Sequence, residues 1–591
     1  MELQALLAVA ILAVVLVTLV REVASPAAVI VGGLVAFVLV GILPPDEAFL
    51  GFANPATISV AGLFVVSRAV RDHAGLQAAV GRALGDGRAG PRPALVRLLP
   101  PVIGLSGVVN NTPIVAAGGP IVRDWAERHG VAATHLLIPL SFAAIIGGTL
   151  TVIGTGPNLV VAGLVASSGA GEFGFFTLTP VGLPVALIGV VLLVALAPRL
   201  LPDRRSPHEQ VAGHERDYTI RLTVDPQGPV AGASVAEAGL RDLPTTYLAS
   251  VLRRGREIAP VAPSTTLEGG DVLVFVGQVD DVSELLAHPG LIEAEQPQTV
   301  LLDGDGHELV ECVVASSSPL VGSTLKAASF RGRYGGAVVA IHRAGERLDR
   351  KLGAVELRPG DALLVLADAA FTERWQGRPD FAVVTASGNG QTTTPRSRHR
   401  TVTLATLVAM VVLAASGLVP IVTAILAACA VLVVTGAIGF RRALDSLDRD
   451  VIIIVASAIG LGAGLQASGL AGDIASVIAA GAQQGGPLIA LALIVLGTML
   501  LTEMITNVAA AALMVPIALD TAVRVGFDPI GFAVAVALAA SASFLTPIGY
   551  QTNTIVYGLG GYRFGDFWRL GLPLALTTLA TTLVVVPLVW G

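Results

Sequence analysis

Long apolar segments interrupted by short polar breaks dominate both ends of the chain. LQALLAVAILAVVLVTLV and PAAVIVGGLVAFVLVGIL each approach the ~20 residues that a helix needs to cross a bilayer. The breaks are GLSGVVNNTP and GGTLTVIGTGPN in the first part, and LTEMITNVA and ASFLTPIGYQTN in the last. Such a break cannot expose its backbone to lipid, so each one must be buried in protein or line a cavity.

Polarity divides the chain into three blocks: apolar residues 1–200, a polar stretch over about 201–398, and apolar residues 399–591. The middle block alternates like β-structure and repeats itself at an offset of 90, as Arg253 and Arg343 illustrate. Five domains are therefore predicted: a transmembrane repeat at 1–200, α+β modules at 206–290 and 298–385, a linker at 386–400, and a second transmembrane repeat at 401–591.

The two apolar blocks align with each other at a nearly constant offset of 394 to 396 residues. Asn111 matches Asn507 at the polar tips, and Asn158 matches Asn553 at the second breaks. Two further landmarks match as well: Gly41 with Gly436 and Gly75 with Gly469. Interrupted hydrophobic segments at corresponding places in two halves are typical of the binding site of a secondary transporter.

Lys and Arg alternate between successive loops, and this alternation predicts orientation. Basic residues follow the first and third apolar segments, whereas PPDEAFLGFANP and SSGAGEFGFF carry none. With the basic loops in the cytoplasm, the segment around Asn111 enters from the inside and that around Asn507 from the outside. We therefore expect a polytopic α-helical protein of two inverted repeats with re-entrant hairpins, multi-pass in the inner (plasma) membrane, with the α+β insert cytoplasmic.

Composition agrees with a membrane protein and excludes other classes. The chain is 53% hydrophobic and only 14% charged, with a mean hydropathy of +0.76, whereas soluble domains carry about 25% charge. The first apolar run lacks a basic n-region and a clear cleavage site, so we interpret it as a retained helix. Cys312 and Cys429 fit neither a disulfide framework nor a metal cluster. Without a nucleophile triad, phosphate loop or nucleic-acid motif, we expect neither an enzyme nor a nucleic-acid partner.

The breaks have the chemistry to bind an anion and cations together. Half-helix N-termini donate N–H groups and carry partial positive charge, while freed carbonyls and side-chain oxygens suit a hard cation such as Na⁺. No Lys or Arg lies close to either tip in the sequence. Glu503 is the acidic residue deepest in a hairpin; it is either a proton or cation site, or a salt-bridged or helix-capping carboxylate.

These motifs resemble those of the divalent anion/sodium symporter family, the SLC13-like permeases. That family carries Ser-Asn-Thr at each hairpin tip, where this chain has Asn110-Asn111-Thr112 and Thr506-Asn507-Val508. A Gly-Thr-Pro-Pro-Asn type loop follows each hairpin in the family; GTGPN is close to it and GYQTN departs. The resemblance covers both apolar blocks.

The resemblance implies a set of binding residues. One sodium site would comprise Ser106, Asn110, Asn111 and Gly154, and the other Thr502, Ile505, Asn507 and Gly549. The small anionic substrate would lie between them, in contact with Asn110, Asn111, Thr112, Thr155, Thr506, Asn507 and Tyr550. The resemblance also implies a homodimer that works by an elevator-type motion, with Na⁺ as the coupling ion.

The middle block resembles two TrkA-C (RCK C-terminal) regulatory domains, carried by SPLVGSTLKAASFRGRYGGAVVAIHRAGERL and the turn LRPGD. Such domains imply regulation and a possible small-molecule ligand. Symporters with this insertion look like sulfate transporters, which favours sulfate or a related oxyanion over di- and tricarboxylates. A cation transporter or channel gated by RCK-like modules is a third hypothesis, but a channel would need a filter such as TVGYG, which the sequence lacks.

Overall fold

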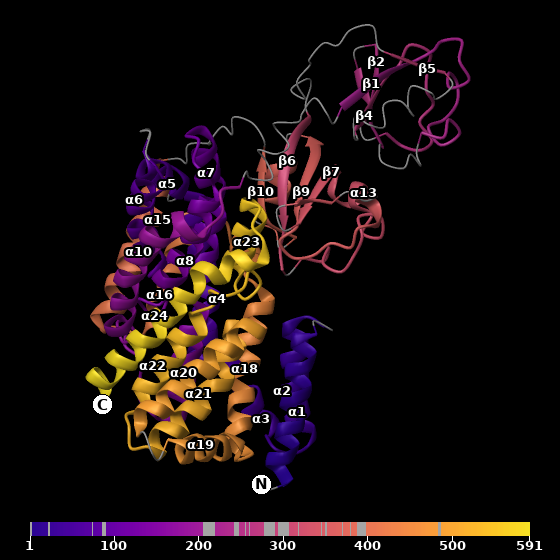
Figure 1. Ribbon diagram of the computed structural model, residues 1–591. Coiled ribbons are helices and arrows are strands. Elements are labelled where there is room, and N and C mark those ends of the chain that lie inside the picture. Colours follow the sequence, from indigo (N-terminus) through magenta and orange to yellow (C-terminus); the bar gives the residue numbers. More distant parts are fainter. Residues whose placement is uncertain are drawn as a thin grey trace. The chain divides into compact units, whose positions relative to one another are not determined.

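The computed structural model describes residues 3–21, 24–73, 75–85, 90–204, 219–240, 247–254, 256–258, 261–276, 290–293, 307–316, 318–343, 346–348, 352–368, 370–376, 378, 380–386, 397–482 and 486–591. The chain divides into two compact units, one helical and one rich in β-strands (Figure 1). The helical unit comprises Met1–Asp203, Thr393–Val556 and Arg563–Gly591, and the other comprises Arg204–Thr392 and Tyr557–Tyr562. Most of the predicted linker, 387–396, lies outside the described residues.

The first part of the helical unit contains ten α-helices and one short 3₁₀ helix among the described residues. They are α1 (Leu3–Val20), α2 (Pro26–Leu39), α3 (Pro45–Ala48), η1 (Leu50–Ala53), α4 (Pro55–His73), α5 (Leu76–Leu84), α6 (Pro91–Ser106), α7 (Asn111–Arg128), α8 (Thr134–Gly148), α9 (Gly156–Ser168) and α10 (Thr179–Leu200). Proline at the first positions of α2, α6, α9 and α10 favours these helix starts, since an N-terminal residue needs no backbone donor.

The second part of the helical unit follows the same order of long and short helices. It comprises α15 (Ser397–Ser416), α16 (Ile421–Val434), α17 (Phe440–Asp445), α18 (Arg449–Ala467), α19 (Leu470–Gly481), α20 (Pro487–Met504), α21 (Asn507–Arg524), α22 (Pro529–Ser541), the first part of α23 (Gln551–Gly560) and α24 (Phe564–Trp590). The residues of α23 from Tyr557 onward are grouped with the other unit. α7 and α21 each span 18 residues, and both begin at the asparagine of a polar tip.

Apolar length is sufficient for a multi-pass membrane protein. Within the described residues, six helices are long and apolar enough to cross a bilayer: α10, Arg398–Ser416 of α15, α18, α20, α21 and α24. Shorter apolar helices accompany them, including α2, α8, α9, α16 and α22. α8 and α22 are buried almost throughout, so these two helices form the centre of the unit rather than its lipid-facing surface.

Helix packing joins the two parts of the helical unit. α8 packs against α6 and α7, and α22 packs in the corresponding way against α20 and α21. α2 packs against α18, and α16 packs against α4, so the second apolar helix of each part contacts the fourth helix of the other. α9 contacts both α21 and α22. The first and second breaks are therefore held within one packed body.

The described residues of the other unit form two five-stranded antiparallel sheets with the same topology. The first has the order β3-β2-β4-β1-β5 and the second β8-β7-β9-β6-β10. The strands are β1 (Thr219–Val224), β2 (Tyr247–Arg253), β3 (Arg256–Ile258), β4 (Val272–Val276), β5 (Leu291–Glu293), β6 (His307–Val314), β7 (Gly336–Arg343), β8 (Glu346–Arg347), β9 (Ala362–Asp368) and β10 (Phe381–Ala386). Short helices α13 (Phe330–Tyr334), η4 (Leu352–Ala354) and α14 (Phe371–Trp375) accompany the second sheet.

The same buried ion pair holds the turn of each sheet. Arg253 donates two hydrogen bonds to Asp271, at 2.9 and 2.7 Å, and Arg343 donates two to Asp361, at 2.8 and 2.7 Å. Both aspartates are almost fully buried, and a bidentate guanidinium fits a carboxylate well. Cys312 lies in the core of the second sheet, where burial raises the pKa of its thiol well above the usual value. The described cysteines are both free thiols.

Candidate functional site

Four helices begin at the four polar breaks of the helical unit. α7 begins at Asn111, α9 at Gly156, α21 at Asn507 and α23 at Gln551. The first N–H groups of a helix have no partner within it and carry partial positive charge. Thr506 caps α21 by accepting a hydrogen bond from Ala509 N at 3.3 Å. The Asn110 side chain makes no such cap on α7.

One asparagine pairs the freed carbonyls of each second break. Asn158 Nδ2 donates to the carbonyls of Gly148 and Thr151, both at 2.9 Å. Asn553 Nδ2 donates in the same way to Ser543 O at 2.9 Å and Thr546 O at 3.1 Å. Both asparagines are fully buried, and their carbonyl partners stand ten and seven residues before them. The two breaks therefore share one pattern of asparagine-to-carbonyl hydrogen bonds at the same spacing.

The hairpin tip of each part contacts the second break of the other part. Asn111 Nδ2 donates to the Tyr550 hydroxyl at 2.9 Å, and Thr112 donates to Gln551 Oε1 at 3.2 Å. At the other tip, a Cβ atom placed on Gly156 would lie 3.6 Å from Val508 Cγ2. The breaks thus meet in a crossed arrangement, which brings the N-termini of α7 and α23, and those of α9 and α21, close together.

Both polar atoms of the Asn111 side chain have hydrogen-bond partners at the first tip. Its Oδ1 lies 2.7 Å from the Ser106 hydroxyl, whose single proton is shared with the carbonyl of Ala144, also at 2.7 Å. Its Nδ2 contacts Tyr550, whose hydroxyl also lies 2.8 Å from Thr155 Oγ1. Ser106, Asn111 and Thr155 are buried. A tyrosine hydroxyl therefore already occupies the polar groups that sequence reasoning assigned to substrate.

The second tip leaves a polar group without a partner. Asn507 is buried, and its side-chain nitrogen has no hydrogen-bond partner among the described residues. Thr502, which stands where Ser106 does in the first part, donates to Ala540 O at 2.6 Å instead. An unpaired buried N–H costs about 1–3 kcal/mol, so an acceptor is expected to bind there during function.

Gly154, Ile505 and Gly549, three of the predicted sodium residues, lie at or beside helix ends of the helical unit. Gly154 lies against the Gly148 carbonyl so closely that a Cβ would clash with it. Ile505 has an extended backbone conformation at the end of α20, with φ −132° and ψ −178°, which turns its carbonyl out of the helix. Gly549 lies beside Glu503, Ser543 and Thr546. Its own N–H donates to Thr546 Oγ1 at 3.0 Å.

Sequence reasoning missed Ser141, a residue of α8 that distinguishes the two breaks. Its hydroxyl lies 2.7 Å from Asn553 Oδ1 and 2.8 Å from Thr552 Oγ1. The corresponding position of α22 is Val536, which has no polar atom, and Asn158 Oδ1 has no partner among the described residues. Because this oxygen can only accept, it is suited to a water or a cation.

Glu503 is bound to the second break. Its Oε1 accepts from Leu545 N and its Oε2 accepts from the Thr546 hydroxyl, both at 2.8 Å. In the described part of the chain, the carboxylate makes neither a salt bridge nor a helix N-cap. The salt-bridge and capping alternatives of the sequence analysis therefore do not describe it.

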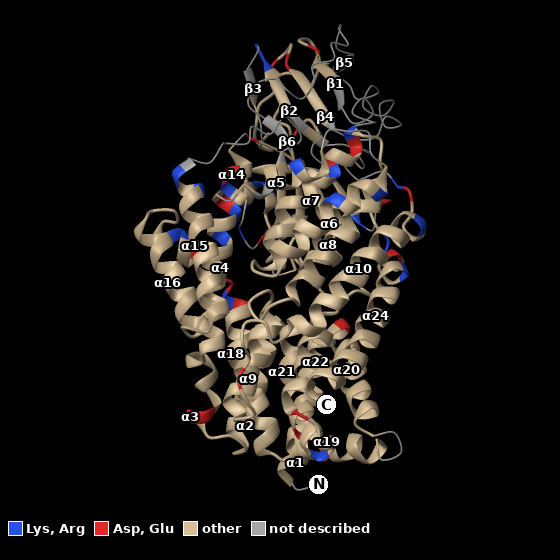
Figure 2. Ribbon diagram, turned by 90° about the vertical axis from the view of Figure 1, so that its left-hand side faces the viewer, with Lys and Arg blue, Asp and Glu red and all other residues tan. Residues whose placement is uncertain are grey.

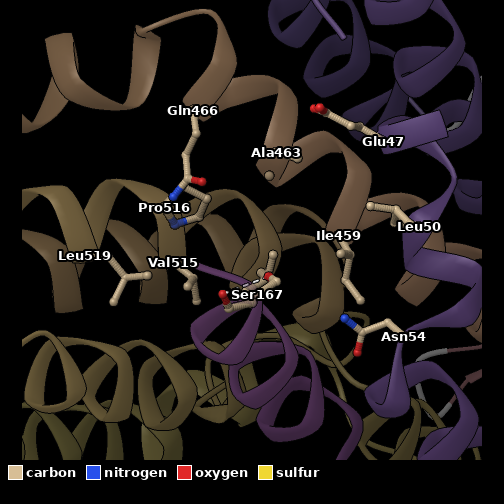
Figure 3. Close-up of a pocket in the computed structure, with 12 residues that line it drawn as sticks. Glu47, Leu50, Asn54, Ser167, Ile459, Ala463, Gln466, Val515, Pro516 and Leu519 are labelled. Carbon is tan, nitrogen blue, oxygen red and sulfur yellow. Dashed lines mark hydrogen bonds between the residues drawn. The ribbon is translucent and has the colours of Figure 1, made fainter. Parts of the chain in front are cut away.

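A cavity of about 300 Å³ opens farther along α9 and α21 (Figure 3). It is lined by Leu164 and Ser167 of α9, Val515, Pro516 and Leu519 of α21, Ile459, Gly462, Ala463 and Gln466 of α18, and Glu47, Leu50 and Asn54. Leu164 and Val515 each stand eight residues after the start of their helix, about 12 Å along its axis. No predicted site residue lines this cavity, so it is separate from the polar breaks.

The fold and these helix-end sites define a multi-pass membrane transport protein rather than an enzyme. A family model described as citrate transporter matches residues 13–537. The chain therefore belongs to the citrate transporter family.

Curated relatives cover nearly the whole chain. An uncharacterized transporter of Synechocystis is 32% identical over 573 residues, which are 94% of this chain and 92% of that protein. A putative sulfur deprivation response regulator of Chlamydomonas reinhardtii is 31% identical over 560 residues, with 93% and 95% covered. The probable sodium/sulfate cotransporter 3 of the same alga is 25% identical over 746 aligned positions, with 90% and 82% covered.

Asn158→Ala is expected to destabilise the first break. It leaves the carbonyls of Gly148 and Thr151 buried without a donor, at about 1–3 kcal/mol for each group. Thermal unfolding of the purified protein in detergent, followed by intrinsic fluorescence, should show a clearly lower midpoint. Ser141→Val is the matched control. It removes the hydrogen bond to Asn553 Oδ1 and leaves both carbonyl pairings intact, so this oxygen then lacks a described partner, as Asn158 Oδ1 does. An equal loss in both variants would contradict the carbonyl-pairing role.

Proposed function

We propose that this protein is a sodium-coupled symporter of a divalent anion, with sulfate or a related oxyanion as substrate. The observation that carries the proposal is the crossed arrangement of helix N-termini: α7 with α23 through Asn111–Tyr550, and α9 with α21 through Gly156–Val508. Helix ends bind anions without a cationic side chain. In this role the unpaired Asn507 nitrogen donates to an anion oxygen.

The other groups at the breaks support sodium coupling as part of this proposal. An anion bound only by helix ends and amides keeps much of its charge, which a co-bound cation can balance. The backbone at Ser106, Gly154, Ile505 and Gly549 and the unpaired Asn158 Oδ1 supply oxygen ligands for such an ion. The name of the sodium/sulfate cotransporter relative supports the same assignment.

Tyr550 favours a compact anion. Its hydroxyl engages Asn111 and Thr155 at 2.9 and 2.8 Å, so these groups are not open to the second carboxylate of a longer substrate. The alternative, a sodium-coupled di- or tricarboxylate symporter, is favoured by the citrate transporter family match. The residue at position 550 therefore distinguishes a sulfate symporter from a di- or tricarboxylate symporter in this proposal.

Alternating access by an elevator-type motion is the proposed mechanism, on two inverted repeats with re-entrant hairpins. Lys and Arg of the helical unit gather at the end with α5, α6 and α15, and few lie at the end with α19 (Figure 2). The positive-inside rule places the former end in the cytoplasm. The chain enters and leaves the insert there, so the insert is cytoplasmic and the transporter lies in the inner membrane.

The insert is proposed to be a pair of TrkA-C-like regulatory domains in a homodimeric transporter. Its two sheets share one strand order and one ion pair, which supports a tandem module. Such a module can bind a small-molecule ligand and change the rate of transport without contacting the transported anion.

Proteoliposomes are expected to take up sulfate in the presence of a Na⁺ gradient and not when choline replaces Na⁺ at the same pH. Asn111→Ala and Asn507→Ala should each reduce uptake to the level of empty liposomes, because each removes an amide at a hairpin tip. Radioactive sulfate uptake provides the measurement, and a monodisperse elution profile serves as the folding control. Undiminished uptake in choline, or near-normal uptake in either variant, would refute the proposal.

Tyr550→Thr gives position 550 the residue found at the corresponding position of the first half, Thr155. This variant should let succinate or citrate compete with sulfate. We expect a shift of roughly ten-fold in relative inhibition, about 1.4 kcal/mol, because the ring and hydroxyl no longer occupy the first tip. Tyr550→Phe keeps the ring and removes only the hydroxyl, so it shows how much of the shift comes from freeing Asn111 and Thr155. Wild-type selectivity in Tyr550→Thr would show that this residue does not select the anion.

Removing residues 206–390 should change the rate or regulation of uptake and leave the order of substrate preference intact. The physical reason is that the described substrate residues all belong to the helical unit. The measurement is competition of sulfate uptake by phosphate, succinate and citrate in full-length and shortened protein. An altered preference order would indicate that the insert takes part in substrate recognition.

A further inference from the structure

Glu503 is a negative charge that the protein itself does not balance. It lies in the last turn of α20, where the helix end already carries partial negative charge. Its hydrogen-bond donors Leu545 N and the Thr546 hydroxyl are both neutral. Among the described residues no charged side chain acts on it. Glu503 is partly buried, and a partly buried carboxylate without a counter-charge is stabilised by a bound cation or a proton.

Asp520 shows how the same half of the protein treats another carboxylate. It lies one turn before Arg524 on α21, and the opposite charge of that side chain acts on it. Both side chains also lie near Gly472. A Cβ atom placed on this glycine would be 3.8 Å from an Asp520 oxygen and 3.2 Å from an Arg524 nitrogen. Glu503, unlike Asp520, has no such counter-charge among the described residues.

Oxygen atoms from three residues surround one face of Gly549. A Cβ atom placed there would lie 3.0 Å from Glu503 Oε2 and 3.0 Å from Thr546 Oγ1, and closer still to Ser543 Oγ. Ser543 is completely buried, and its hydroxyl has no hydrogen-bond partner in the described part of the chain. Buried hydroxyls almost always find a partner, so this one points to a ligand that the structure does not contain.

The corresponding place in the first half is neutral. Gly107 stands where Glu503 does, and Gly148 stands where Ser543 does. Thr151, the counterpart of Thr546, donates to the backbone carbonyl of Gly107 instead of to a carboxylate. The two halves share the backbone arrangement, but only the second adds a full negative charge and a free hydroxyl.

We propose that Glu503, Ser543 and Thr546 form a site for one monovalent hard cation at the second break. Its oxygen ligands suit Na⁺, and it shares Gly549 with the sodium residues predicted from the sequence. The site presupposes the cation-coupled transport proposed above. Because its counter-charge is part of the protein, this Na⁺ binds in the absence of the anion, whereas a neutral first-half site binds Na⁺ together with the anion.

Equilibrium binding of radioactive sodium to the purified full-length protein tests this order. The buffer contains no sulfate or carboxylate substrate, and choline keeps the ionic strength constant. Wild-type protein should bind Na⁺, Glu503→Gln should bind it at least ten-fold more weakly, and the matched control Asp520→Asn should bind it like wild type. Wild-type Na⁺ affinity in Glu503→Gln would overturn the site.

Ser543→Ala separates a cation ligand from a packing residue. If the hydroxyl binds Na⁺, its removal lowers Na⁺ affinity several-fold, and added Na⁺ raises the unfolding temperature less than in wild type. If the hydroxyl has no ligand, its removal relieves an unpaired polar group, so the protein becomes more stable and Na⁺ affinity stays unchanged. The second result would overturn the proposal, and this variant decides the matter if Glu503→Gln does not fold.

Transport assays distinguish failure of this site from failure of the symport function. Sulfate uptake that depends on Na⁺ in wild type and is unchanged in Glu503→Gln would overturn the site and leave the function standing. Glu503→Gln with wild-type Na⁺ affinity but altered pH dependence of uptake would mark a proton site and would also overturn it. Na⁺ binding that Glu503→Gln abolishes, in a protein that transports no sulfate, would retain the site and reject the function.

Discussion

The helical unit depends on pairing the backbone carbonyls that its polar breaks release. In a low-dielectric interior each unpaired carbonyl is costly, and Asn158 and Asn553 each pair two of them. Those four hydrogen bonds fix the chain just before α9 and α23. The direction of these helix N-termini, and hence the field available to an anion, follows from the two asparagine amides rather than from any cationic side chain.

Crossed contacts turn two separate breaks into one coupled site. Asn111 and Thr112 of the first tip bind Tyr550 and Gln551 of the second half, while Val508 of the second tip packs near Gly156 of the first. Moving one hairpin tip away from the opposite break therefore breaks two polar contacts on one side. A substrate oxygen that replaces the Tyr550 hydroxyl on Asn111 would offset that loss, which links occupancy to movement.

The helix starts at the breaks could be predicted from local sequence. The hydrogen-bond partners of the tip residues could not, because they depend on long-range packing. The Asn-Thr tip sequences and the constant spacing correctly located breaks at Asn111 and Asn507, because capping and turn preferences act over a few residues. The Asn111–Tyr550 bond joins residues 439 apart, and nothing in either local sequence specifies it. For Glu503 the sequence offered a salt bridge or cap as the alternative to an ion site, and its real partners are Leu545 N and Thr546.

Side-chain differences on a common backbone separate the tasks of the two halves. Thr155 corresponds to Tyr550, so the first tip is closed by a phenol and the second keeps an open amide at Asn507. Gly107 corresponds to Glu503, so charge is present on one side only. In a transporter with two identical halves, each half would bind its ligands with the same affinity. In the proposed mechanism, the fixed carboxylate of one half would hold one cation before the anion arrives, whereas the anion and a second cation would bind together in the neutral half.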